Sequence, residues 1–161
     1  MKNSQRTLVL LIGADYIRLH NASTAILTDI GDELLYFEPT RSKGSLMPFS
    51  VGTLITRSAA VVEQMVGGIT TKLWDDPFEW TLPERMPTTT DVIAYLNEVE
   101  ASRVAGFTFL RSDDDLYKKI PSPVEIRTLF EILLQTLIVA QRLYGNAESL
   151  LRLVKDSQLS R

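Results

Sequence analysis

The stretch Glu131-Ile-Leu-Leu-Gln-Thr-Leu-Ile-Val-Ala-Gln-Arg-Leu-Tyr-Gly-Asn-Ala-Glu-Ser-Leu-Leu-Arg-Leu-Val154 decides the fold of this chain. Taken as one long helix, it is apolar on most of its circumference. A helix of that kind is stable only where other helices cover it on several sides. The stretch therefore predicts an all-α protein in which this segment belongs to a helical bundle.

Three further segments carry apolar residues at helical spacing, which predicts three more long helices. They cover residues 6–37, about 50–66 and 88–110. The first segment allows a second interpretation, in which residues 7–12 form a strand that leads into Gly13 as in a nucleotide-binding fold. No GxGxxG motif follows, and the downstream chain lacks strand-like runs, so the helix is the favoured interpretation.

Several short motifs predict where these helices begin and end. Ser50 suits the N-cap of the second helix through its hydroxyl, and Gly67-Gly68 is expected to end that helix. Ser112-Asp-Asp-Asp-Leu116 predicts a capped turn or a short helix. Ser122-Pro-Val-Glu125 is expected to begin the fourth helix, because it places a proline at the first helical position and a glutamate where a capping box needs one.

Residues 67–87 between the second and third helices look irregular. A connection of that length is uncommon unless it has a task. Here it can be a crossover that lets the second and third helices run in the same direction, whereas a short connection forces neighbouring helices to be antiparallel. Four long helices with one crossover predict a four-helix bundle.

The size and charge of the chain exclude several classes of protein. With 161 residues we expect one domain that covers residues 1–161. The net charge of -3 and the scattered basic residues give no electrostatic basis for binding nucleic acid or a membrane surface. No stretch reaches the ~20 apolar residues of a membrane span.

The chain contains no cysteine and a single histidine, His20. The lack of cysteine excludes disulfides and thiolate catalysis, and it fits a cytoplasmic protein. Residues 8–14 leave open a short signal peptide, although no clear cleavage site follows. One imidazole rules out zinc sites that need two histidines from one chain. His20 itself can be a general base or a structural histidine.

The order of several motifs resembles the DinB/YfiT-like superfamily. Ser50-Val-Gly-Thr-Leu-Ile-Thr-Arg57 is similar to the family's beginning of helix two, and Ser112 to Leu116 is similar to its Ser-x-Asp-Asp-Leu turn. Val139-Ala-Gln-Arg-Leu-Tyr-Gly-Asn146 resembles its His-x-x-x-His-Arg-Gly-Gln in helix four. The resemblance covers nearly the whole chain. It implies a left-handed four-helix bundle, up-down-down-up, with a long crossover between helices two and three, and usually a homodimer.

The same resemblance implies that the family's metal site is missing from this chain. Metal-containing members hold a divalent ion with one histidine from helix two and two from helix four. The first position falls on Arg57, a fixed cation that repels a divalent metal. The other two fall on Val139 and Leu143, which have no donor atoms. We therefore expect no metal and no other cofactor there.

Arg57 is the first candidate for binding a ligand. It is expected to face the family's pocket near Asn146 and Glu63, where a cation can bind a carboxylate or a phosphate. The alternatives are an internal salt bridge to Glu63 or Glu148, or an exposed position on the helix.

Gln141, Trp74 and Trp80 complete the set of candidate ligand-binding residues. Gln141 can line a cavity, or it can face solvent or a subunit interface. The two tryptophans can cover a ligand pocket, or they can hold the crossover loop on the bundle. Gly145 costs ~1 kcal/mol relative to alanine within a helix, and close helix packing is its expected cause.

Three functions remain open. The first is a metal-free DinB-like protein that binds a small molecule in the bundle pocket. The second is a thiol transferase or metal-dependent hydrolase of the family type that uses other ligands. The third is a structural or interaction protein that acts as a helical-bundle dimer. No nucleophile elbow, P-loop or HExxH motif marks a catalytic centre.

Overall fold

The computed structural model describes residues 5–39 and 49–160, and it is mostly helical, as the apolar spacing predicts. The described residues form five α-helices, two short 3-10 helices and a two-stranded antiparallel sheet. In chain order the elements are α1 (Thr7–Ile30), α2 (Asp32–Leu35), α3 (Val51–Thr71), η1 (Pro77–Trp80), α4 (Thr89–Phe107), η2 (Asp113–Tyr117), β1 (Lys119–Pro121), β2 (Ile126–Thr128) and α5 (Leu129–Leu159).

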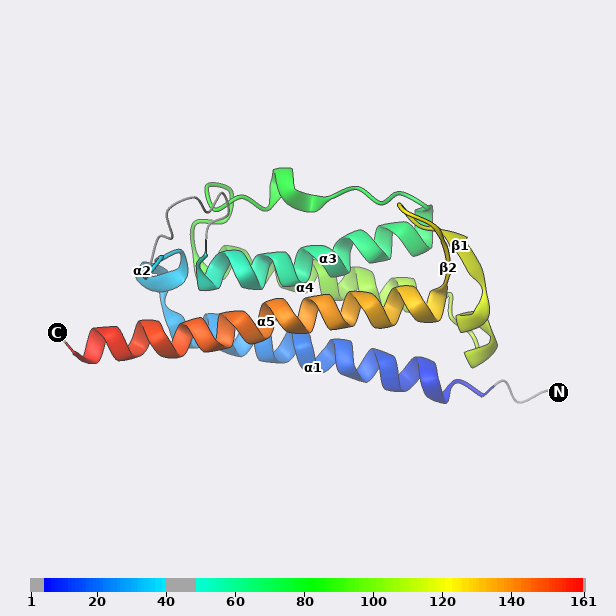
Figure 1. Ribbon diagram of the computed structural model, residues 1–161, viewed down its shortest axis with the longest axis horizontal. Helices are drawn as coiled ribbons and strands as arrows, with labels where there is room; N and C mark the ends of the chain where they lie inside the picture. Colours follow the sequence, from blue (N-terminus) through cyan, green and yellow to red (C-terminus); the bar gives the residue numbers. More distant parts are fainter. Residues whose placement is uncertain (1–4, 40–48, 161) are drawn as a thin grey trace.

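The four long helices α1, α3, α4 and α5 lie along the long axis of the molecule (Figure 1). Helix α3 packs against α4 and α5, and α1 packs against the same two helices from the other side. The core between them contains large, fully buried side chains from every long helix, among them Leu27, Ile55, Met65, Val92 and Leu133. Residues 7–12 lie within α1, so the strand interpretation of that segment is wrong. No helix in the described residues is long and apolar enough to cross a membrane.

The segment predicted as the first helix is divided at Gly31. Helix α1 ends at Ile30, and Gly31 adopts a left-handed φ of 76°, a conformation that glycine reaches without steric cost. The four-residue helix α2 follows directly. The break turns the chain, so the apolar residues beyond Gly31 belong to a separate element.

Helix α3 continues through Gly67-Gly68, which corrects the prediction that these glycines end it. The helix ends at Thr71, and Lys72 adopts the left-handed conformation with a φ of 61°. A Cβ atom at position 68 would lie 2.3 Å from Cε2 of Trp74. Gly68 therefore makes room for the Trp74 ring and has no role in ending the helix.

The chain between α3 and α4 returns along the length of α3 before α4 begins (Figure 1). It contains η1, whose N-cap Asp76 accepts a hydrogen bond from the backbone N–H of Phe78. Helix α4 then starts with a capping box in which the Thr88 hydroxyl accepts from the Asp91 N–H and the Asp91 carboxylate accepts in return. The predicted N-cap at Ser50 is confirmed, since the Ser50 hydroxyl accepts a hydrogen bond from the Thr53 N–H.

The prediction that Ser122-Pro-Val-Glu125 begins the last helix is wrong. These residues form the turn of the β1–β2 hairpin, in which the Ser122 N–H donates to the Glu125 carbonyl at 3.0 Å. Helix α5 begins at Leu129, where Thr128 and Glu131 form the capping box. Both stretches share a Ser/Thr-x-x-Glu pattern, but only Thr128 directly precedes the uninterrupted apolar run.

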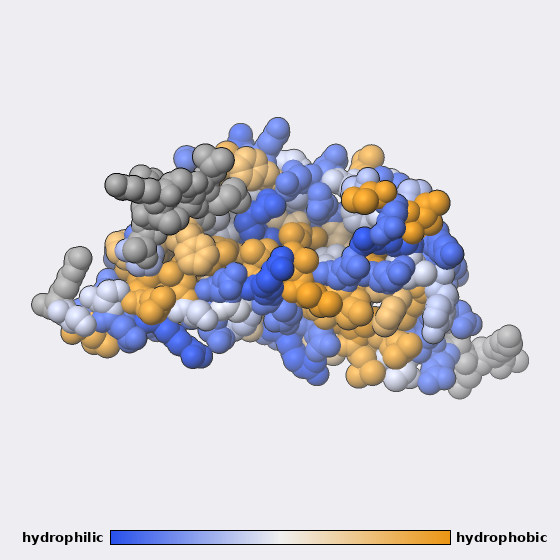
Figure 2. Space-filling model, in the orientation of Figure 1, coloured by the Kyte–Doolittle hydropathy of each residue, from blue (hydrophilic) through white to orange (hydrophobic). Residues whose placement is uncertain are grey.

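Helix α5 is covered on fewer sides than its composition suggests. Its buried residues, including Leu133, Ala140 and Ala147, face α3 and α1. Other apolar residues of the same helix stay in contact with solvent, among them Phe130, Leu134, Ile138 and Leu153. Figure 2 shows apolar surface over the N-terminal parts of α1 and α5. The expectation that other helices cover α5 on several sides is therefore met on one face only.

Candidate functional site

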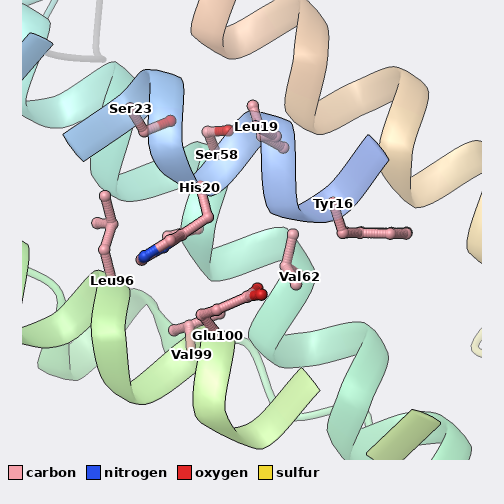
Figure 3. Close-up of a pocket in the computed structure, with 10 residues that line it drawn as sticks. Tyr16, Leu19, His20, Ser23, Ser58, Val62, Leu96, Val99 and Glu100 are labelled. Carbon is pink, nitrogen blue, oxygen red and sulfur yellow. The ribbon is translucent and has the colours of Figure 1, made fainter. Parts of the chain in front are cut away.

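A small, partly open cavity lies between α1, α3 and α4 (Figure 3). The residues that line it combine apolar side chains with a few polar ones: Tyr16, Leu19, His20, Ser23, Ser58, Ala59, Val62, Leu96, Val99 and Glu100. The single histidine of the chain thus lies at the wall of the interior cavity, which raises the question of whether it belongs to a catalytic group.

Two hydroxyl groups around this cavity are engaged in structural contacts. The Ser58 hydroxyl donates to the Ala140 carbonyl at 2.8 Å, and the Tyr16 hydroxyl donates to the Leu133 carbonyl at 2.6 Å. Burial raises the pKa of Tyr16 well above its ordinary value, so this phenol stays protonated. Figure 3 shows the His20 ring and the Glu100 carboxylate pointing in different directions. They therefore form no acid–base pair.

The size of the cavity decides what can enter it. Its volume is about 30 Å³. A buried water needs at least ~10–15 Å³, whereas sites for small molecules measure ~300–1,000 Å³. The cavity can hold one or two waters, and a metabolite does not fit without rearrangement of the helices.

Arg57 and Trp80 take part in a polar network beneath the connection between α3 and α4. Arg57 Nη1 lies 3.1 Å from Oδ1 of Asp76, and its guanidinium group stands 6.0 Å from the centre of the Phe78 ring. The Trp80 indole N–H donates to the Glu63 carboxylate at 3.3 Å. These contacts fix η1 on the outer face of α3.

Tyr95 of α4 completes this network by donating its hydroxyl hydrogen to Oε2 of Glu63. Burial and the neighbouring Glu63 raise the pKa of Tyr95 far above its ordinary value, so the phenol remains a donor at physiological pH. The acidic partner of Arg57 is Asp76, where the sequence suggested Glu63 or Glu148. In this arrangement Arg57 and Trp80 hold the crossover on the bundle.

The candidate residues of α5 do not converge on a cavity. Gln141 and Asn146 are exposed, while Val139 and Leu143 are partly buried. The cavity between α1, α3 and α4 is lined neither by Arg57 nor by these four residues. The described residues also contain no group of three or more His, Cys, Asp and Glu side chains placed to hold a metal ion.

Trp74 is the sequence-predicted candidate that does line a pocket, one larger than the cavity between α1, α3 and α4. The pocket has a volume of about 180 Å³ and lies where α3 and α5 meet the β1–β2 hairpin. Its walls come from α3 with the connection that follows it, and from the hairpin with the start of α5 that follows it: Gln64, Trp74, Ser122, Pro123, Val124, Arg127, Ile132, Gln135 and Thr136. We refer to it as the Trp74 pocket.

Hydrogen bonds fix most polar groups of the Trp74 pocket and leave two amide atoms available. Gln64 Nε2 donates to the Trp74 carbonyl at 3.0 Å, so its Oε1 remains an acceptor. Gln135 Oε1 accepts from Arg127 Nη1, so its Nε2 remains a donor. The Trp74 indole N–H donates to the Pro121 carbonyl at 3.2 Å, which holds the ring in place.

The charge of the pocket is nearly balanced. Arg127 is the cation that lines it, and both Nε and Nη2 of Arg127 donate to Glu125 Oε1, at 2.9 and 2.8 Å. The pocket therefore suits an uncharged ligand with a planar group and with both a hydrogen-bond donor and an acceptor. Apart from Trp74, its residues carry no signal in the sequence, because the hairpin that assembles them lies where a helix start was predicted.

Comparisons of the chain with protein-family models, with curated proteins and with solved structures find no match. The resemblance to the DinB/YfiT-like superfamily therefore rests on the sequence motifs alone. Any function for this chain has to be argued from its own geometry.

Proposed function

We propose that this protein is a metal-free, DinB-like helical bundle that binds a small, uncharged molecule in the Trp74 pocket. The single observation that carries the proposal is this pocket of about 180 Å³, which combines an anchored indole ring with a free amide donor and a free amide acceptor. A planar heterocycle or a primary amide matches these groups, because it can stack on an aromatic face and exchange two hydrogen bonds.

The arrangement of the helices supports the DinB-like part of the proposal. In Figure 1, α3 and α4 start at the same end of the molecule, while α1 and α5 start at the opposite end. This order is what the up-down-down-up topology of that superfamily requires. The absence of cysteine from all 161 residues supports a cytoplasmic location, and fractionation of cells that produce the protein tests it.

A thermal-shift screen tests the binding proposal. The screen uses uncharged heterocycles and amides such as nicotinamide and uracil, together with small carboxylates and thiols for comparison. A ligand present at ~100 times its dissociation constant stabilises the folded protein by about 2.7 kcal/mol. We expect at least one uncharged planar compound to raise the melting temperature and the charged compounds to have no such effect.

Two matched variants locate the site. Gln135→Ala removes the free donor of the Trp74 pocket, and Gln141→Ala makes the same change at an exposed position of the same helix, outside the pocket. We expect Gln135→Ala to abolish the ligand-induced shift and Gln141→Ala to retain it. If Gln141→Ala abolished the shift and Gln135→Ala retained it, the ligand would bind on the face of α5 that the family resemblance suggested. That outcome would refute the Trp74 pocket as the binding site.

A second candidate function is self-association as a homodimer. The observation that favours it is the number of exposed apolar side chains on two neighbouring helices, α1 and α5: Leu8, Leu11, Phe130, Leu134 and Ile138. Exposed apolar side chains that gather on one surface commonly mark an interface with another protein.

Light scattering tests the dimer with two similar changes. Ile138→Glu places a charge in the apolar patch, and Leu153→Glu places one at a similarly exposed position nearer the C-terminal end of α5; the side chains are 58% and 62% exposed. We expect a dimer that Ile138→Glu converts to a monomer and Leu153→Glu leaves intact. A wild-type monomer at micromolar concentration would refute the dimer.

A further inference from the structure

A groove between α1 and α4 has the chemistry of a second binding site, separate from the Trp74 pocket. It measures about 310 Å³, at the lower end of the range for small-molecule sites. Its walls are mainly apolar and its polar members are mainly basic: Arg6, Val9, Leu10, Gly13, Ala14, Ile17, Arg103, Val104, Phe107 and Thr108. No carboxylate is among these residues.

Arg103 is buried at the floor of this groove, with 3% of its surface exposed. Its Nε and Nη2 atoms bind the two carboxylate oxygens of Glu100 at 2.9 and 2.7 Å. The ring of Phe107 lies 4.7 Å from its guanidinium carbon. The remaining nitrogen, Nη1, has no hydrogen-bond partner among the described residues, and it lies against Gly13, 3.7 Å from the place of a Cβ atom there.

Arg6, at the end of the groove, is likewise held by two of its three guanidinium nitrogens. Its Nε donates to the Leu110 carbonyl at 2.7 Å, and its Nη2 donates to the Phe107 carbonyl at 2.9 Å. These acceptors are neutral backbone groups, so the positive charge of Arg6 is not balanced by them, whereas the ion pair with Glu100 balances the charge of Arg103 and leaves its Nη1 as a hydrogen-bond donor. Its Nη1 also has no hydrogen-bond partner in the described part of the chain. The groove thus offers two anchored guanidinium groups, each with one free nitrogen.

The walls above these cations expose apolar surface. Leu10, Ile17 and Val104 are 61%, 45% and 51% exposed. A free inorganic anion would use the cations and leave this apolar surface in water. A ligand with an anionic head and an aliphatic tail uses both, because its tail buries apolar area at ~25 cal/mol per Å² while its head pairs with Nη1 atoms.

We propose that the groove between α1 and α4 binds a medium-chain monocarboxylate, with its carboxylate on Arg103 and Arg6 and its alkyl chain along Leu10, Ile17 and Val104. The volume suits a single short chain better than a folded partner. The site does not depend on the function proposed for the Trp74 pocket, since the two share no residue.

Calorimetric titration with octanoate tests this proposal. Octanol, which has the same tail without the charge, and octyltrimethylammonium, which has the opposite charge, serve as probes of the head group. We expect octanoate to bind with one site per chain, more weakly at high salt, and the other two to bind at least about tenfold more weakly. Equal affinity for octanoate and octanol would overturn the role of the two arginines.

Charge variants at an exposed wall position test the location without disturbing the buried Arg103. Leu10→Glu should weaken octanoate binding about tenfold or more, whereas Leu10→Lys should retain it. Leu153→Glu on α5 is the matched control and should leave binding unchanged, as should Gln135→Ala in the Trp74 pocket.

If both Leu10 variants bind octanoate like the wild type, the groove is not the site. If octanoate fails to bind and Leu10→Glu instead splits a dimer in light scattering, the groove is covered by a second copy of the chain, and the proposal is wrong.

Discussion

Gly68 and Gly145 show how surroundings decide the effect of the same residue. A Cβ atom at Gly68 would collide with the Trp74 ring at 2.3 Å, whereas a Cβ atom at Gly145 would meet nothing within 4 Å. The sequence suggested close helix packing as the reason for Gly145, and that interpretation is wrong within this chain. A glycine with open space around it carries the entropic cost of its type and gains nothing in packing.

Alanine at these two glycines should have opposite effects on stability. Gly145→Ala should raise the free energy of unfolding by about 0.5–1 kcal/mol, because alanine loses less conformational freedom in a helix. Gly68→Ala should lower it by about 1–3 kcal/mol through overpacking against Trp74. Urea denaturation of both variants beside the wild type measures the two changes. A Gly145→Ala variant that is less stable would indicate that another molecule packs against this position.

Tyr36 connects the end of α2 to the chain just before α4. Its hydroxyl donates to the Met86 carbonyl at 2.7 Å, and the ring packs against the core. Burial, with the negative charges of Asp91 and Glu84 adding to it, raises the pKa of Tyr36 to about 12. The folded state therefore holds this proton more tightly than the unfolded state, in which the pKa of tyrosine is about 10.

This difference predicts a loss of stability at alkaline pH. The contribution of Tyr36 is fully present below about pH 10 and disappears as the pH rises through about 12. Tyr36→Phe lacks both the hydrogen bond and the titration, so it should be less stable than the wild type near neutrality, by about 1 kcal/mol. The difference in the free energy of unfolding between the two proteins should narrow between about pH 10 and pH 12. Urea unfolding of both proteins across this pH range checks the prediction. A difference in the free energy of unfolding that stays constant with pH would show that Tyr36 does not cause the loss of stability.

At the scale of elements, the beginning of α5 illustrates how two similar signals compete. Ser122 and Thr128 each precede a glutamate by three residues, but Ser122 closes the turn of the hairpin and Thr128 caps the helix. The Thr128 N–H and hydroxyl both donate to Oε2 of Glu131 at 2.8 Å, which lowers the pKa of that carboxyl. The cap therefore depends on an ionised Glu131 and weakens as acid protonates it.

Thr128→Ala should cost about 1 kcal/mol of folding free energy, because the Glu131 N–H in the first turn loses the hydroxyl oxygen that accepts its hydrogen bond. Ser122→Ala should cost less, since the backbone hydrogen bond from Ser122 to Glu125 remains. Urea denaturation near neutral pH compares the two variants. Equal losses, or a larger loss for Ser122→Ala, would mean that the helix begins earlier than Leu129.

At the scale of the whole molecule, the bundle is held together by apolar packing among the long helices and by polar contacts of the crossover. The positions where a DinB-like metal site is expected carry Arg57, Val139 and Leu143. Arg57 is bound to Asp76, so its charge is fixed beside α3. None of these three side chains offers a donor atom that suits a divalent metal.

Chelation should therefore leave the protein unchanged. We expect the melting temperature of protein purified without a histidine tag to be the same with and without EDTA, and elemental analysis to find no stoichiometric zinc, nickel or iron. One metal ion per chain, with a drop in melting temperature after its removal, would contradict the prediction and point to ligands outside the family positions.

The helical class, the approximate positions of the long helices and the N-cap at Ser50 follow from apolar spacing and local hydrogen bonding, so the sequence by itself determines them. The helix signals fail at Gly67-Gly68 and at Ser122, because the packing of a side chain decides the first position and the pairing of two strands decides the second. The indole ring of Trp74 needs the space at Gly68, and the hairpin needs the turn at Ser122.

The candidate sites depend still more on the tertiary structure. Local sequence marks Trp74 only as an aromatic residue in a long connection, but the amides of Gln64 and Gln135 join it because α3, α5 and the hairpin meet. Likewise, Arg6 and Arg103 share a groove although 97 positions separate them in the sequence, because α1 packs against α4. Periodicity reports which face of a helix is buried, whereas a binding site depends on which faces of different elements are brought together, and only packing decides that.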